Sequence, residues 1–140
     1  MITNVKRLLD GVTKWASQRP SILAVALVGS QARGTASACS DVDLVIVTRD
    51  ADALLRDTKW VEEFGHALRQ ETERHGNLAV CRVWYQHGLE VEFGFSDESW
   101  PLDPGGQAVM ADGLRVLLDR GPLRDHHAGG AAVRGFSARA

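Results

Sequence analysis

Two neighbouring stretches decide the fold of this chain. Residues 27–34 are Leu-Val-Gly-Ser-Gln-Ala-Arg-Gly, and residues 40–47 are Ser-Asp-Val-Asp-Leu-Val-Ile-Val. Before the first polar turn, Ile22 to Val28 is a continuous apolar run with β-branched residues, and a second apolar run begins within the Asp-Val-Asp sequence. Apolar runs of this length, bounded by polar turns, predict buried strands. The two polar turns are therefore expected to lie side by side at the ends of two core strands.

The first turn has the properties of a phosphate-binding site. Gly29 has no Cβ, so a bulky anion can approach the main chain closely, and Ser30 adds a hydroxyl. Arg33 carries a planar cation suited to phosphate, with a plain surface salt bridge as the alternative role. A helix that begins at Ser30 would also point its free N–H groups at the anion. The pattern predicts binding of a triphosphate.

The second turn supplies paired carboxylates. Asp41 and Asp43 are two residues apart at the start of a strand, so both side chains project to the same face, while Val42 and Leu44 point into the core. Magnesium prefers oxygen ligands and takes one or two carboxylates from a protein, with phosphates and water completing its shell. The spacing therefore predicts a magnesium site.

A third acidic group is expected from Gly88 to Phe95, the one later strand-like run that carries suitable carboxylates. Here Glu90 and Glu92 share one face, and apolar side chains share the other, which is typical of a half-buried strand. We favour Glu92 as metal ligand or base because it lies deeper in the run. Glu90 is the alternative, and a merely solvated face for both glutamates stays open.

In combination these motifs resemble the signature of the nucleotidyltransferase superfamily, which includes DNA polymerase beta, the aminoglycoside and lincosamide nucleotidyltransferases and the minimal nucleotidyltransferases. The resemblance covers roughly Ile22 to Asp119 and depends on the order Gly-Ser, Arg-Gly, then Ser-Asp-Val-Asp-Leu entering a strand. It implies an α+β fold of the α/β type, in which a mixed sheet of about five strands is flanked by helices.

The resemblance also implies an activity and a set of roles. The activity is magnesium-dependent transfer of a nucleoside monophosphate from an NTP, with ATP as the default donor, and release of pyrophosphate. The residues matched to the phosphate-binding turn are Gly29 and Ser30, those matched to the metal ligands are Asp41 and Asp43, and Glu92 or Glu90 matches the third acidic position. Arg33 would neutralise the leaving pyrophosphate. Two metal ions about 3.5 to 4 Å apart would stabilise the attacking and leaving oxygens.

The resemblance leaves the acceptor open. The run after Gly88 looks most like bacterial antibiotic-type or uncharacterised single-domain members, which implies a small hydroxylated acceptor such as an antibiotic, and a role in antibiotic resistance. Relatives of that type often add a helical domain that shapes the acceptor pocket, so we expect a homodimer partner to supply this wall. The alternative is an antitoxin-type or NTP-binding module that modifies or masks a protein, such as a helical toxin.

Outside the motifs, hydrophobic periodicity predicts the remaining elements. An N-terminal helix is expected over Asn4–Gln18, strands over Leu78–Tyr85 and Leu89–Phe95 joined as a hairpin, a short helix around Gln107–Ala111, and a last strand over Gly113–Asp119. A second helix is predicted from Trp60, Val61, Phe64, Ala67 and Leu68, closing near His75-Gly76.

Length and composition bound the organisation of the chain. With 140 residues, 44% of them hydrophobic and 24% charged, the chain has room for one core. We expect a catalytic domain over residues 1–121 and a flexible tail over residues 122–140, in which His126 and His127 are solvated rather than metal ligands.

Net charge and the two cysteines indicate which kinds of partner and which cellular compartment to expect. The net charge of −2 without a basic block argues against a nucleic-acid partner, and no apolar stretch reaches membrane-spanning length. The N-terminus lacks a signal-peptide pattern. Cys39 and Cys81 do not form a disulfide framework, and reduced thiols favour a cytoplasmic protein.

Overall fold

The computed structural model describes residues 3–34, 41–75 and 78–124. In chain order the elements are α1 (Thr3–Ser17), β1 (Ile22–Val28), α2 (Gly29–Arg33), β2 (Val42–Thr48), α3 (Ala51–Arg56), η1 (Lys59–Phe64), β3 (Ala67–His75), β4 (Leu78–Tyr85), β5 (Glu90–Ser96), η2 (Trp100–Leu102), α4 (Pro104–Asp112) and β6 (Leu114–Asp119). The labels η1 and η2 denote short 3-10 helices.

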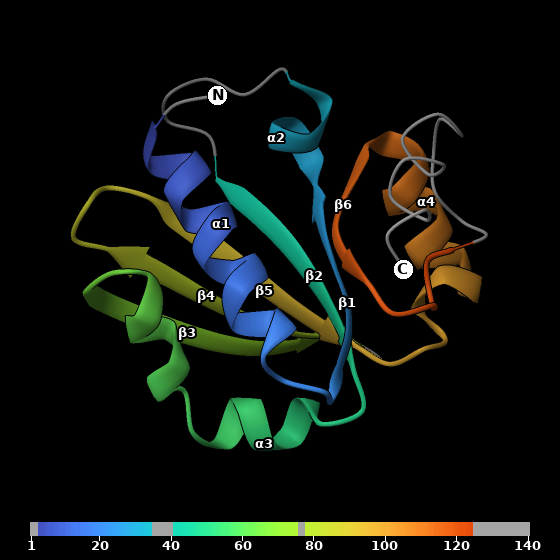
Figure 1. Cartoon of the computed structure of the whole chain (residues 1–140), viewed down its shortest axis with the longest axis horizontal. Coiled ribbons are helices and arrows are strands. Elements are labelled where there is room, and N and C mark those ends of the chain that lie inside the picture. The colour runs from blue at the N-terminus through green and yellow to red at the C-terminus, as the bar shows by residue number, and fades with distance from the viewer. Residues whose placement is uncertain (1–2, 35–40, 76–77, 125–140) are drawn as a thin grey trace.

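One mixed sheet organises the described residues. Its six strands follow the order β3-β4-β5-β2-β1-β6, in which β2 and β5 are parallel and every other pair is antiparallel. Figure 1 shows α1 lying across one face of the sheet, with α4 beside β6 and α2 at the end of β1. The predicted α+β fold with a mixed sheet flanked by helices is confirmed, with six strands in place of about five.

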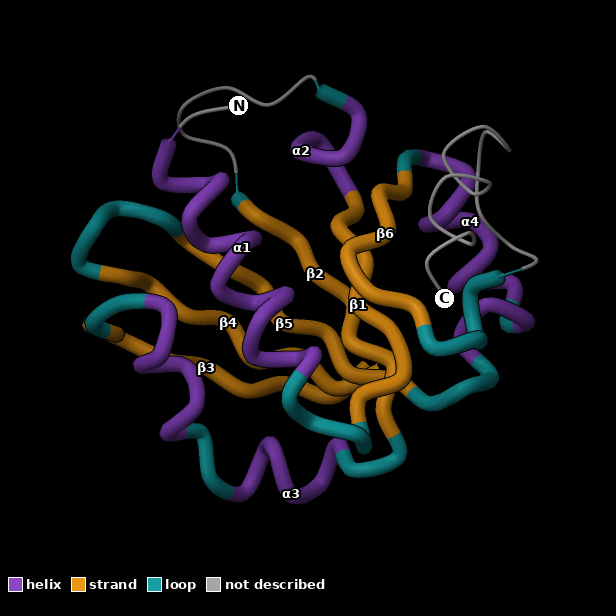
Figure 2. The backbone as a smooth tube through the Cα atoms, in the orientation of Figure 1, coloured by secondary structure: helices purple, strands orange, loops and turns teal. Residues whose placement is uncertain are grey.

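The additional strand, β3, replaces the second half of the predicted second helix, so that prediction is wrong in part. Only its first part is helical, as η1, and the chain then turns at Gly65 with a φ of +147°. Ala67 to His75 forms β3, which pairs with β4 along its length (Figure 2). Residues 67–75 carry mostly polar side chains, so a helix there would have no apolar stripe to pack on the core, whereas the edge of β4 pairs with the backbone groups of this segment. Pairing across the sheet therefore overrides the helical pattern of the preceding residues.

The other predicted elements are confirmed within a few residues. The N-terminal helix, the hairpin of β4 and β5, the short helix α4 and the last strand β6 all occur where the periodicity placed them. The hairpin is closed by a hydrogen bond from the Tyr85 N–H to the Leu89 carbonyl, 2.9 Å long.

The main core lies between α1 and the sheet. It contains both residues predicted to face inward after the carboxylate pair, Val42 and Leu44, which are 0% and 2% exposed. The indole of Trp15 stacks on that of Trp60 with ring centroids 5.1 Å apart, and Phe93 meets Trp60 edge-on at 5.0 Å. This packing joins the helix, the η1 segment and the central strands into one unit.

A second, smaller core fixes the end of the described chain. Leu123 is fully buried on the opposite side of the sheet, where it packs with Trp100 and Met110. The Asp119 carboxylate holds the turn before it by accepting the N–H groups of Gly121 at 2.8 Å and Leu123 at 3.2 Å. The packed domain therefore extends beyond the predicted boundary at residue 121. The predicted flexibility of residues 125–140, and the solvated His126 and His127, lie outside the described residues, as does Cys39.

We expect Leu123→Ala to destabilise the protein by about 2–4 kcal/mol, because it leaves a cavity in a closed core. Leu102→Ala is the matched control, since Leu102 is 66% exposed and its truncation should change stability by less than about 0.5 kcal/mol. Urea denaturation of both variants measures the difference. Equal stability of the two variants would mean that Leu123 is not part of the folded domain.

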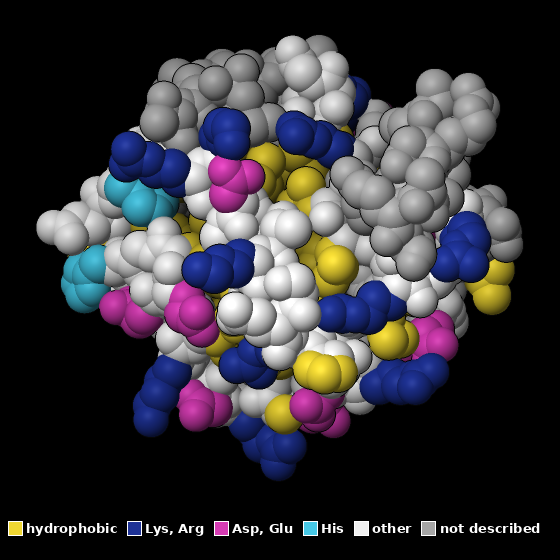
Figure 3. Space-filling view, in the orientation of Figure 1, with side chains coloured by type: hydrophobic (Ala, Val, Ile, Leu, Met, Phe, Trp, Pro, Cys, Tyr) yellow, Lys and Arg dark blue, Asp and Glu magenta, His cyan; other side chains and the backbone are white. Residues whose placement is uncertain are grey.

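Charged side chains of both signs are spread over the face of the molecule that carries α1 (Figure 3). Lys and Arg side chains lie interspersed with Asp and Glu on this face, as Figure 3 shows. Among the described helices, not one combines the length and the apolar character required to cross a bilayer.

Candidate active site

The glycine turn lies directly against the predicted metal ligands. β1 ends at Val28, which pairs with Asp43 of β2, and α2 begins at Gly29 as the sequence predicts within one residue. Gly29 has a φ of +74°, and a Cβ placed there would lie 2.7 Å from Oδ2 of Asp43. Glycine is therefore required twice, for its backbone conformation and for the space that Asp43 occupies.

Four carboxylates meet at this end of the sheet. Asp43 of β2 is in parallel register with Glu92 of β5, and the two side chains are hydrogen-bonded to each other. Asp41, just before β2, makes the equivalent contact with Glu90 at the start of β5. The sequence left a choice between Glu90 and Glu92, and the structure brings both glutamates to the aspartates.

The crowding of negative charge changes the protonation of the aspartates. Burial, followed by the hydrogen bond and the negative charge of Glu92, raises the pKa of Asp43 to about 7. The pKa of Asp41 is also raised, first by burial and then by the negative charge of Glu90. The same crowding of carboxylates that raises these pKa values favours the binding of a cation among them.

One member of this cluster, Arg82, is not predicted by the sequence motifs. Arg82 of β4 is in register with Glu92, and its guanidinium donates from Nη1 to Glu90 Oε2 at 3.0 Å and from Nη2 to Glu92 Oε1 at 3.1 Å. The negative charge of Glu92 is the main cause that raises the pKa of Arg82. A charged residue between the buried Cys81 and Val83 was the available signal, but its partners depend on strand order.

Arg33 makes a salt bridge in this structure. Its Nη1 lies 2.5 Å from Oδ2 of Asp112 at the end of α4, and both side chains are exposed. The salt bridge considered from the sequence is therefore present, while contact with phosphate stays a prediction. An exposed pair of this kind contributes about 0–1 kcal/mol, so an incoming phosphate can compete for the guanidinium.

The donor set fits magnesium by its chemistry. Among residues 3–34, 41–75 and 78–124, no three His, Cys, Asp or Glu side chains are arranged as ligands of one ion. Magnesium does not require three, because phosphates and water usually complete a shell begun by one or two carboxylates. Asp41 and Asp43, with Glu92 adjacent, have the hard oxygen donors and the excess negative charge that such an ion needs.

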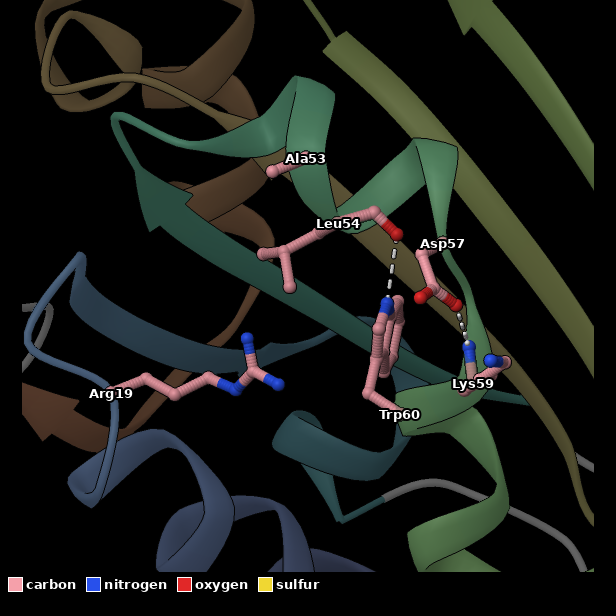
Figure 4. A pocket seen from close by; sticks show the side chains of 6 residues that line it. All are labelled: Arg19, Ala53, Leu54, Asp57, Lys59 and Trp60. Carbon is pink, nitrogen blue, oxygen red and sulfur yellow. Dashed lines mark hydrogen bonds between the residues drawn. The ribbon is translucent and has the colours of Figure 1, made fainter.

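A separate pocket of about 250 Å³ lies near the opposite ends of β1 and β2, between α3, η1 and the segment before β1. Figure 4 shows Arg19 extending toward Leu54 and Trp60. The Trp60 indole N–H donates to the Leu54 carbonyl at 2.8 Å, and Asp57 accepts the Lys59 N–H at 3.2 Å. The pocket contains none of the predicted site residues.

The raised pKa of Asp43 predicts how stability depends on pH when metal is absent. Between about pH 4 and pH 7 the folded state retains a proton that the unfolded state releases, so stability falls as the pH rises through this window. In Asp43→Asn this contribution disappears. Denaturation in EDTA at pH 5 and pH 8 should therefore show a smaller loss for the variant than for wild type. Identical losses would place the Asp43 pKa near its ordinary value.

Comparison with one solved structure supports the assignment of the fold. An aminoglycoside 6-adenyltransferase from Bacillus subtilis superposes with a TM-score of 0.56 at 13% identity, over 81% of this chain and 40% of that one. The polymerase core of TRAMP, an RNA surveillance complex, gives a TM-score of 0.47 at 15% identity, over 77% of this chain and 38% of that one. The chain thus spans about two fifths of the length of these proteins. No curated protein sequence matches it.

The family is shown by sequence. The model of the streptomycin adenylyltransferase family matches residues 2–98, which include the glycine turn and all four carboxylates. Together with the fold, this match makes the protein a member of the nucleotidyltransferase superfamily. The chain belongs to the streptomycin adenylyltransferase family.

Proposed function

We propose that this protein transfers a nucleoside monophosphate from an NTP, with ATP as the default donor, to a hydroxyl group of an aminoglycoside-like small molecule. One observation carries the proposal: Asp43, with Asp41 two residues before it, packs against a glycine turn that has no Cβ to displace the Asp43 carboxylate. The family match supports the same activity.

The donor phosphates would bind over the start of α2. Gly29 has a positive φ at the start of α2, and Ser30 follows directly, so main-chain N–H groups and a hydroxyl would be available there to the phosphate oxygens. Arg33 would exchange Asp112 for the β- and γ-phosphates, where its planar fork suits the phosphate oxygens. The α-phosphorus would then lie over Asp41 and Asp43.

The transfer is an in-line substitution at the α-phosphorus. The acceptor oxygen forms a bond to this phosphorus while the bond to the bridging oxygen of the β-phosphate breaks, and pyrophosphate leaves with the bonding electrons. The acceptor hydroxyl gives its proton to the carboxylate of Glu92 or to solvent. Since pyrophosphate departs toward α2, the acceptor approaches from the side of β5.

Asp41 and Asp43 would hold magnesium, with Glu92 as a further ligand, and the ions when bound would neutralise charge on the phosphates and activate the acceptor oxygen. The carboxylates of the protein fix where this charge neutralisation occurs. Their negative charge also sets the specificity of the site for complexes of NTP with a divalent cation.

The proposed acceptor class follows from the family and from the fold neighbour that acts on aminoglycosides. The experiment is to incubate the purified protein with each of the four NTPs, Mg²⁺ and a panel of aminoglycosides that includes streptomycin. Pyrophosphate release and a nucleotidylated product detected by mass spectrometry are the expected results. EDTA and the Asp41→Ala/Asp43→Ala double variant should abolish both.

Two other outcomes would overturn the proposal. Tight binding of MgATP without product from any acceptor would point to a nucleotide-binding module, and modification of a protein from the source cell would point to a protein-directed enzyme. Absence of magnesium-dependent NTP binding would contradict the proposed transfer and both of these alternatives.

The choice between the two glutamates is also testable. Glu92 is in register with Asp43, whereas Glu90 contacts Asp41 at the outer end of the strands. We expect Glu92→Gln to lower kcat/KM about 100-fold, within the range found for general bases, and Glu90→Gln to lower it less than about 10-fold. Each variant differs from wild type by the same replacement of a carboxylate oxygen with an amide nitrogen, so each is a control for the other. A larger loss for Glu90→Gln would reverse the assignment.

A further inference from the structure

Arg82 belongs to a row of charged residues that crosses the sheet from β2, the strand that follows Asp41 and contains Asp43, to the edge strand β3. In register, Asp43 of β2 is followed by Glu92 of β5, Arg82 of β4 and Glu71 of β3. Side chains in register on neighbouring strands project to the same face about 5 Å apart. Arg82 is therefore the first cation beyond Glu92, on the side from which an in-line acceptor would approach.

The geometry of the guanidinium suits this position. One Nη atom bonds Glu90 at 3.0 Å and the other bonds Glu92 at 3.1 Å, so the planar fork joins two carboxylates of the same strand. The side chains of the three residues are 38%, 27% and 31% exposed, so the contacts are screened only in part. Without this bridge, Glu90 and Glu92 would repel each other and the aspartates beside them.

We propose that Arg82 is a positioning residue that holds Glu92 beside Asp43 for the transfer reaction and keeps Glu90 away from the reacting oxygen. The inference rests on the proposed function and assigns a role that the motif residues do not supply. Because Arg82 donates to the glutamates rather than to the aspartates, it controls the orientation of the base while leaving the two β2 ligands unobstructed.

Two properties of Arg82 predict different effects, and substitutions separate them. Lysine retains the charge but offers a single ammonium in place of the planar fork, so Arg82→Lys should weaken the orientation of Glu92. Glutamine removes the charge as well, and the loss of a cation near the carboxylates should strengthen their attraction for a divalent ion.

The experiment measures Mn²⁺ binding without nucleotide, by calorimetry or electron paramagnetic resonance, and turnover with MgATP and streptomycin. Arg82→Gln should bind Mn²⁺ about 3- to 10-fold more tightly than wild type, and Arg82→Lys should bind it within about 2-fold of wild type. Both variants should lower kcat about 10- to 100-fold, the range found for residues that orient a metal site, with the KM for MgATP changed less than about 3-fold.

A matched control separates this role from a general effect of removing a surface arginine. Arg74 lies on the neighbouring strand β3, and its Nη2 is 3.1 Å from Oδ1 of Asp52 in an exposed ion pair. Arg74→Gln removes this pair. It should change neither Mn²⁺ affinity nor kcat. Thermal unfolding of each variant confirms that it is folded, and Arg82→Lys decides the question if Arg82→Gln does not fold.

Three results would overturn the proposal: wild-type kcat in Arg82→Lys, weaker Mn²⁺ binding in Arg82→Gln, or an equal effect of the control. Failure of the proposed function would look different. If wild type shows no turnover with any NTP and acceptor, the transfer activity is wrong, and the positioning role falls with it. Tighter Mn²⁺ binding in Arg82→Gln would then establish only that Arg82 lies against the metal-binding carboxylates.

Discussion

Asp43→Asn is expected to lower the rate of nucleoside monophosphate transfer by about 10³-fold, which corresponds to about 4 kcal/mol of transition-state stabilisation. The amide has nearly the shape of the carboxylate but supplies no negative charge to a divalent ion. Measurement of kcat/KM with MgATP and an accepted aminoglycoside tests this expectation directly.

The same substitution is expected to stabilise the protein when metal is absent. Asp43 is packed against Gly29 and hydrogen-bonded to Glu92, and its raised pKa shows that its negative charge is unfavourable there. Removal of the charge should raise the free energy of unfolding by about 1–2 kcal/mol at pH 8 in EDTA, after allowance for partial solvent screening. Loss of activity together with a gain in stability is the behaviour of a functional residue rather than a structural one.

Asp10→Asn provides the control for these measurements. Asp10 is exposed on α1 and pairs with Lys6 four residues earlier, at 2.8 Å. Its substitution should leave both kcat/KM and the pH dependence of stability unchanged. An Asp43→Asn variant with near-normal turnover, or one that is less stable than wild type in EDTA at pH 8, would contradict the assigned role.

Gly29→Ala is the second substitution with a large expected effect. A Cβ at this position meets the Asp43 carboxylate oxygen at 2.7 Å, so the side chain of Asp43 must move. The positive φ adds strain of about 1–2 kcal/mol for a residue other than glycine. We expect a loss of at least about 100-fold in kcat/KM, since small displacements of a reacting group have effects of this size.

Gly34→Ala is closely matched to this variant. Gly34 ends the same helix with a φ of +73°, against +74° for Gly29, but a Cβ there meets no atom of the described residues within 4 Å. Both variants should therefore lose stability in urea denaturation because of the positive φ, with a further loss for Gly29→Ala from the contact with Asp43, and only Gly29→Ala should lose activity. If both variants retained turnover, close packing of the turn against Asp43 would be unimportant for the reaction.

The candidate site was largely predictable because its signals are local. Asp41 and Asp43 alternate with buried residues over one short segment, and the glycine turn ends an adjacent apolar run, so period-two alternation alone predicts that the two carboxylates share a face next to that turn. The alternation likewise assigned Glu90 and Glu92 to one face of their strand. It could not choose between them, because both contact an aspartate once β5 pairs with β2.

The errors concern interactions between distant segments. The polar sequence of residues 67–75 does not by itself favour a helix over a strand. It forms a strand because it can pair with the edge of β4. Leu123 follows a glycine and a proline and lacks periodicity, so its burial depends on the space between the sheet and α4.

The superfamily, the glycine turn, the carboxylate pair and most of the elements follow from local patterns, since hydrophobic alternation and backbone freedom are properties of neighbouring residues. The strand order, and with it the position of Arg82 between Glu90 and Glu92, follows only from the folded chain. Hydrogen bonding between strands brings together side chains that no local pattern relates. The charge balance of the site is a property of that pairing.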